Sequence, residues 1–132
     1  MFEYLSEKFV ENQMETAKVC EEMAVAEDLE PVFARYQELM DLFSAMDGDN
    51  YESNIKKHLY LVGMTNHEHT EISALSGGEY KLLQVMKEML QQPNLLIMDE
   101  PDVFLDFENL NGLMELINSY KGTLLVITHN RY

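Results

Sequence analysis

The sequence has little cysteine and no long apolar run. Its single cysteine, Cys20, cannot form an intrachain disulfide and favours a reducing compartment. No apolar stretch approaches the roughly 20 residues that span a bilayer. The first four residues are not basic and no apolar stretch follows them, so we expect no signal peptide. These absences predict a soluble, cytoplasmic protein or a soluble part of a larger one.

Positive charge is also scarce. Nine Lys and Arg residues stand against 24 Asp and Glu residues, which gives a formal net charge of −15. Binding a nucleic-acid backbone needs basic patches, so these residues are not expected to grip nucleic acid by themselves. Nucleic-acid contact through a larger protein remains open. The 132 residues, 46% of them apolar, are enough for one ordinary domain with a core.

The part of the chain before about residue 65 has apolar residues recurring at intervals of three and four, which is typical of amphipathic helices. Three helices are predicted, at about 2–23, 31–47 and 50–62, and Gly48 and Gly63 close the second and third. Such stripes usually mean core packing alone, and we interpret all three in that way.

Residues 64–74 are a polar connection that contains His67-Glu68-His69. Two histidines this close in a loop rarely converge on one metal ion, and no fourth ligand is evident. We therefore interpret this segment as a connection and not as a metal site.

Helix and strand patterns alternate from Ser76 onward. A helix opened by two glycines leads to the apolar run 95–98, and a second helix, near 107–117, leads to the apolar run 123–128. Short continuous apolar runs are typical of strands buried on both faces of a parallel sheet. Strand, helix and strand form one βαβ unit with parallel strands. The sequence therefore predicts an α/β protein, with a three-helix part followed by an α-β-α-β part.

Polar residues follow both predicted strands. Asp99 and Glu100 follow the first strand and His129 follows the second. Parallel strands share a carboxyl edge, where ligands bind in open α/β sheets. One carboxylate is suited to a hard cation such as Mg²⁺, and its neighbour to accepting a proton from an attacking water. The alternative is that these are solvated loop residues, which is the better interpretation of His129 taken alone.

A second candidate element is the run Leu75-Ser76-Gly77-Gly78-Glu79 at the start of a helix. Two glycines and a serine there let backbone N–H groups approach an anion closely, assisted by the helix dipole. The alternative is an ordinary helix cap followed by flexible glycines.

The order and spacing of these elements resemble the second half of an ATP-binding-cassette (ABC) ATPase domain. In that family residues 75–79 correspond to the signature motif and 95–101 to the Walker B strand with its glutamate. Residues 105–106 correspond to the D-loop and 127–129 to the H-loop. The resemblance implies a parallel sheet of the P-loop NTPase type. It also implies a helical subdomain over 1–74 and part of the nucleotide-binding core over 75–132.

The ABC-F branch of that family is the most similar. Residues 43–63 resemble the segment before its signature, and His129-Asn130-Arg131-Tyr132 resembles its His-Asp-Arg-Tyr. Proteins of that branch are soluble twin-cassette ATPases that act on the ribosome. The rival interpretation is the nucleotide-binding domain of a transporter, docked on a transmembrane subunit.

The resemblance implies a role for each motif residue. The signature residues 76–79 would contact the γ-phosphate of ATP held by a second cassette. Asp99 would hold Mg²⁺ through a water, and Glu100 would polarise the attacking water. His129 would sense the γ-phosphate and stabilise charge in the transition state, and Asp106 would lie at the dimer seam and couple the two sites.

Several features depart from the family pattern. Asp102 replaces a common Thr, Phe104 a common Ala or His, and Asn130 a common Asp. No G-x-x-x-x-G-K-[ST] motif occurs, so these residues alone lack the P-loop and are not expected to hydrolyse ATP. We expect an excised or truncated part of a cassette, or else a non-catalytic half-cassette. Two strands with bare edges also predict self-association.

Overall fold

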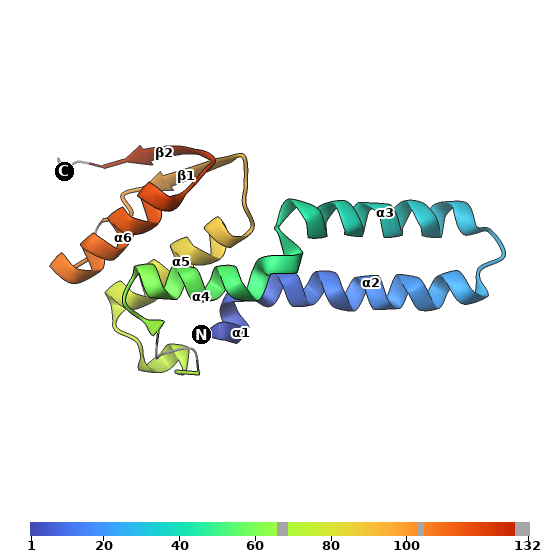
Figure 1. The fold of residues 1–132 in the computed structure, drawn as a ribbon, viewed down its shortest axis with the longest axis horizontal. Helices are drawn as coiled ribbons and strands as arrows, with labels where there is room; N and C mark the ends of the chain where they lie inside the picture. The colour runs from blue at the N-terminus through green and yellow to red at the C-terminus, as the bar shows by residue number, and fades with distance from the viewer. Residues whose placement is uncertain (66–68, 103–104, 129–132) are drawn as a thin grey trace.

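The computed structural model describes residues 1–65, 69–102 and 105–128. The elements along the chain (Figure 1) are α1 (Phe2–Leu5), α2 (Glu7–Val25), α3 (Leu29–Ala45), η1 (Gly48–Asn50), α4 (Tyr51–Leu61), η3 (Ile72–Ala74), α5 (Gly77–Leu90), β1 (Leu95–Asp99), α6 (Phe107–Ser119) and β2 (Thr123–Ile127).

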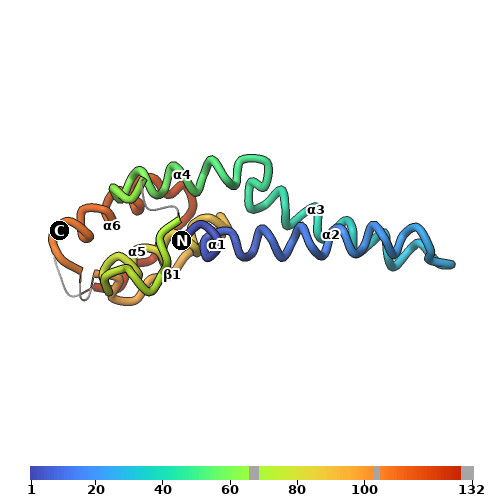
Figure 2. Tube along the Cα trace, turned by 90° about the horizontal axis from the view of Figure 1, so that it is seen from below, coloured from blue at the N-terminus to red at the C-terminus, as the bar shows by residue number. Residues whose placement is uncertain are grey.

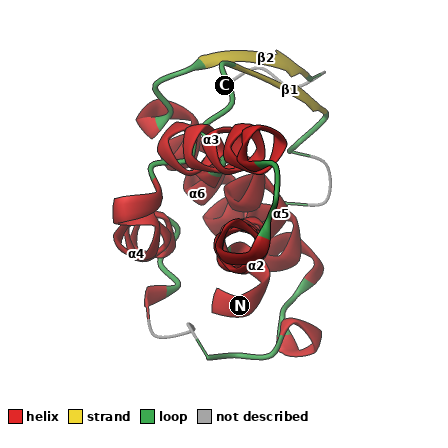
Figure 3. Cartoon of the chain, turned by 90° about the vertical axis from the view of Figure 1, so that its right-hand side faces the viewer, coloured by secondary structure: helices red, strands yellow, loops and turns green. Residues whose placement is uncertain are grey.

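Two regions are distinct in shape. Helices α2 and α3 form an antiparallel pair, here called the hairpin, which projects away from the remaining elements, here called the body (Figures 1 and 2). In the body, the two strands lie together at one side and the helices lie on the other side of the sheet (Figure 3). The α/β class predicted from the sequence is confirmed.

The strands β1 and β2 pair in parallel, with Leu95 opposite Thr123 and Asp99 opposite Ile127. Helix α6 connects them, as the βαβ pattern predicts. The expectation that both strands are buried on both faces is wrong. Alternate apolar residues are about half exposed; they are Leu95, Ile97, Leu125 and Ile127. Because side chains alternate between the two faces of a strand, described helices on one face cover only every second residue.

The core of the body lies among α4, α5 and α6, beneath the sheet. Most of its fully buried side chains come from these three helices, and Leu5 of α1 joins them; those of the three helices include Ile55, Leu59, Leu82, Leu83, Met86, Leu113 and Leu116. Gly112 of α6 lets the helices approach closely, because an added Cβ would lie 3.3 Å from side-chain atoms of Leu82 and Val62. This packing fixes α5 and α6 relative to the strands that they support.

The first predicted helix is not continuous. It ends at Leu5 and resumes at Glu7, with Ser6 between α1 and α2. The carbonyl of Leu5 accepts a hydrogen bond of 3.1 Å from the hydroxyl of buried Tyr51. This partner comes from α4, and helical periodicity in the sequence does not reveal the contact.

The hairpin also differs in detail from the predicted pattern. Asn12 and Val19 are the buried residues of α2, whereas Met14 is 69% exposed. A helix that packs against one neighbour buries only a narrow stripe. The left-handed residue after α3 is Asp47, with φ 53°, and not Gly48, which is buried against the ring of Phe43.

The structure also bears on two features considered in the sequence, a metal site and a membrane-spanning segment. Within the described ranges no group of three or more His, Cys, Asp or Glu residues is arranged to hold a metal ion. His67 and Glu68 lie outside those ranges. Among the described helices, none combines the length and the apolar composition needed to cross a membrane.

Candidate functional site

The carboxyl end of β1 carries the two predicted acids. Asp99 is the last residue of the strand and is exposed. Glu100 follows with a left-handed backbone, φ 48°, and its N–H donates to the carbonyl of Ile127 over 2.6 Å. A left-handed conformation costs a residue other than glycine about 1–3 kcal/mol and persists only where surrounding contacts impose it. The acids therefore lie beside the end of β2, as predicted, while His129 lies outside the described residues.

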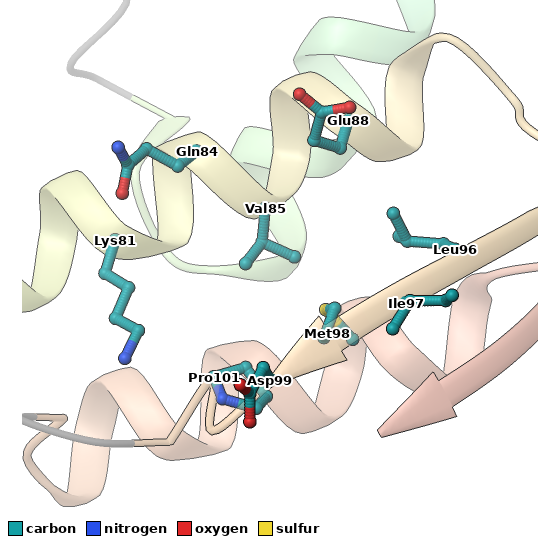
Figure 4. Close-up of a pocket in the computed structure, with 9 residues that line it drawn as sticks. All are labelled: Lys81, Gln84, Val85, Glu88, Leu96, Ile97, Met98, Asp99 and Pro101. Carbon is teal, nitrogen blue, oxygen red and sulfur yellow. The ribbon is translucent and has the colours of Figure 1, made fainter. Parts of the chain in front are cut away.

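The carbonyl of Glu100 has a partner on a different element. It accepts a hydrogen bond of 3.0 Å from Nζ of Lys81, which is on α5. Figure 4 shows Lys81 extending from its helix toward the segment that contains Asp99 and Pro101. Lys81 is not predictable as a site residue from the sequence, because a lysine on the polar side of a helix carries no local sign of such a contact.

The signature residues form a complete capping box at the start of α5. The side chain of Ser76 accepts from the N–H of Glu79 over 3.2 Å, and the side chain of Glu79 accepts from the N–H of Ser76 over 3.0 Å. The ordinary cap considered from the sequence is thus present. The cap still leaves N–H groups at the helix start that can bind an anion, because several first-turn N–H groups have no intrahelical acceptor.

The two signature glycines have different surroundings. A Cβ added at Gly77 would have nothing within 4 Å, whereas one at Gly78 would lie 2.5 Å from Nδ2 of Asn109 and 3.6 Å from the side chain of Leu105. Gly78 therefore packs against the first turn of α6. This contact places the signature turn next to Asp106, which caps α6 by accepting from the N–H of Asn109 over 2.8 Å.

A second link joins the segment after β1 to the end of β2. Asp102 is 7% exposed, and its carboxylate accepts a hydrogen bond of 2.8 Å from the hydroxyl of Thr128. In the sequence Asp102 stood out only as a departure from the family pattern. The contact between Asp102 and Thr128 could have been inferred from their positions, because both residues follow parallel strands that share an edge.

A pocket of about 210 Å³ lies between α5 and β1 (Figure 4). Its α5 side is mostly polar and its β1 side mostly apolar. The residues that line it are Lys81, Gln84, Val85, Glu88, Leu96, Ile97, Met98, Asp99 and Pro101. The pocket reaches from the solvent-exposed side of the sheet to the acidic end of β1.

Comparison with known proteins gives one family match and several relatives whose names refer to ATP binding or to translation. Residues 3–103 match the family described as ABC transporter. The putative ATP-binding protein YdiF of Bacillus subtilis is 34% identical over 106 residues, which are 80% of this chain and 16% of YdiF. The energy-dependent translational throttle protein EttA of Haemophilus influenzae is 30% identical over 105 residues, 80% of this chain and 19% of EttA. The ATP-binding protein Uup of Escherichia coli is 50% identical over 62 residues, 47% of this chain and 10% of Uup.

The chain therefore spans less than a fifth of the length of each of these relatives. The family match extends from α1 to just beyond β1. It confirms the resemblance inferred from the motifs: the chain belongs to the ABC transporter family of ATP-binding cassettes and is most similar to the ABC-F branch.

Proposed function

We propose that this chain forms the signature and Walker B part of an ATPase that hydrolyses ATP between two cassettes. The observation that carries the proposal is the position of Asp99 and Glu100, which lie at the end of a parallel strand beside the end of its neighbour. That edge is where open α/β sheets bind ligands. His129 directly follows the last described residue after β2 in the sequence, so we include it in the proposed site.

The two acids take different parts in the proposed reaction. Asp99 is exposed at the edge of the sheet, and carboxylate oxygens suit Mg²⁺, so Asp99 would hold the ion through a water. When bound, Mg²⁺ neutralises charge on the phosphates. Glu100 accepts a proton from the attacking water, and His129 contacts the γ-phosphate. Such a dispersed set suits phosphoryl transfer, which depends on positioning and electrostatics.

The signature residues act on the nucleotide of the other cassette. N–H groups at the start of α5 and the hydroxyl of Ser76 contact the γ-phosphate, with Glu79 holding the turn in place. Asp106, which caps α6 beside Gly78, lies at the seam between the cassettes. The exposed apolar positions of the sheet are consistent with association with a second cassette or with another copy of this chain.

The phosphate cradle of this ATPase must come from elsewhere. The 132 residues contain no G-x-x-x-x-G-K-[ST], so we propose that they do not hydrolyse ATP by themselves. Residues 1–74 serve as the helical subdomain and 75–132 as part of the nucleotide-binding core. The name of EttA refers to translation, which favours the ribosome as the place of action and the cytoplasm as the compartment.

The proposal is tested by changing Glu100→Gln in the intact protein. Loss of the proton acceptor lowers ATP turnover by about 10²–10⁴-fold while ATP binding is retained. Turnover is measured by phosphate release and binding by a fluorescent nucleotide. Glu115→Gln is the matched control, because Glu115 is exposed on α6 away from the strand end, and it leaves both quantities unchanged. Unchanged turnover in Glu100→Gln would remove Glu100 from the proposed role.

A further inference from the structure

The backbone of Glu100 is held from two sides by different elements. Its N–H donates to the carbonyl of Ile127 at the end of β2, over 2.6 Å. Its carbonyl accepts from Nζ of Lys81 on α5, over 3.0 Å. Lys81 is half-buried beside the pocket between α5 and β1. The end of β2 thus accepts from the N–H of Glu100, and α5 donates to its carbonyl.

This residue adopts a conformation that needs support. Glu100 is left-handed, with φ 48°, and L-residues with a Cβ rarely adopt this region. Pro101 follows it, and a following proline disfavours the right-handed helical region for the residue before it. The chain therefore cannot relax Glu100 simply by continuing as a right-handed helix. Contacts from outside the segment decide which conformation persists.

We propose that Lys81 is a positioning residue that holds the left-handed backbone of Glu100 and so sets where its carboxylate lies. Lys81 is five positions beyond Ser76, the N-cap of the same helix, and it links α5 to the acid at the strand end (Figure 4). The effect of Lys81 on ATP turnover rests on the proposed function. The hydrogen bond between Lys81 and the backbone of Glu100 is independent of that function.

The first test measures the backbone in the 132-residue chain. Lys81→Met keeps the length of the side chain and removes the donor, so exchange of the Glu100 amide hydrogen accelerates about tenfold relative to the β2 amides. Lys81→Arg keeps a donor and restores slow exchange. Lys18→Met, on the exposed side of α2, removes a lysine of equal charge far from the sheet and changes neither rate.

The pattern of exchange separates positioning from general stability. A purely structural role of Lys81 accelerates exchange throughout the body by the same factor. Uniform acceleration, or no acceleration at Glu100, overturns the proposal.

The second test measures ATP turnover in the intact protein. Lys81→Met lowers kcat about tenfold with the KM for ATP unchanged, because the carboxylate is displaced while nucleotide binding is retained. Lys81→Arg recovers kcat. If Glu100→Gln lowers turnover but Lys81→Met leaves kcat unchanged, the positioning role is wrong. If Glu100→Gln is itself without effect, the proposed function fails, and selective exchange at Glu100 still establishes the Lys81 contact.

Discussion

The hairpin and the body are made from similar amphipathic helices, yet they are held together in different ways. In the hairpin, residues 7–45, the buried positions are Asn12, Val19 and Leu39. In the body, α5 alone buries five side chains, which pack between helices and sheet. A helical stripe in a sequence thus identifies a helix but not how many neighbours will cover it. The hairpin is a two-helix structure, whereas the body has a core.

The junction between the two regions is aromatic. The ring of Phe9 at the start of α2 stacks on Tyr51 with centroids 5.0 Å apart and lies 6.0 Å from the ring of Phe43. Tyr51 also donates to the carbonyl of Leu5, and burial raises the pKa of its hydroxyl to about 12. The base of the hairpin is therefore fixed to the body, and its far end is held by little beyond the pairing of α2 with α3. Opening of the hairpin should cost less free energy than opening of the body.

The largest expected effect on stability is in the body. Leu83→Ala removes a side chain that is 0% exposed in the core, and it lowers the free energy of unfolding by about 2–5 kcal/mol. Urea denaturation of the 132-residue chain measures this loss. Leu42→Ala in the hairpin is the control, because Leu42 is 53% exposed, and its effect stays within about 0.5 kcal/mol. Equal losses at the two positions would remove the distinction between the regions.

A smaller and local effect is expected in the hairpin. Asn12 donates from Nδ2 to the carbonyl of Leu39 over 2.9 Å, within the buried stripe between α2 and α3. Asn12→Ala leaves that carbonyl without this donor and costs about 1–3 kcal/mol. Hydrogen exchange should accelerate in α2 and α3 and not in α5 or α6. Met14→Ala, at a position 69% exposed, serves as the control. Acceleration throughout the body would show that the hairpin does not open separately.

Features that depend on nearby residues were predictable from the sequence. The capping box joins Ser76 to Glu79, three positions apart, and the order of strands and helices after residue 76 follows from local apolar patterns. The shared edge of the strands follows from the parallel rule, and it places Glu100 beside the end of β2.

Contacts between distant residues were not predictable in this way. The carbonyl of Leu5, at the break before α2, accepts from Tyr51 of α4, and the carbonyl of Glu100 accepts from Lys81 of α5. Neither residue type is unusual at its position, so the partner becomes evident only once the elements are packed. The exposed sheet face has a similar cause, because a continuous apolar run does not reveal how many layers cover it.

The most direct test of the account is ATP turnover by the intact protein carrying Gly77→Ala. A Cβ at this position meets nothing within 4 Å, so the substitution should leave the midpoint of unfolding unchanged or slightly higher. If the start of α5 contacts a phosphate through its backbone, the added methyl group lowers turnover about 10²-fold in a protein of undiminished stability. Turnover equal to that of the unsubstituted protein would contradict the assignment of this helix start as a nucleotide-binding element.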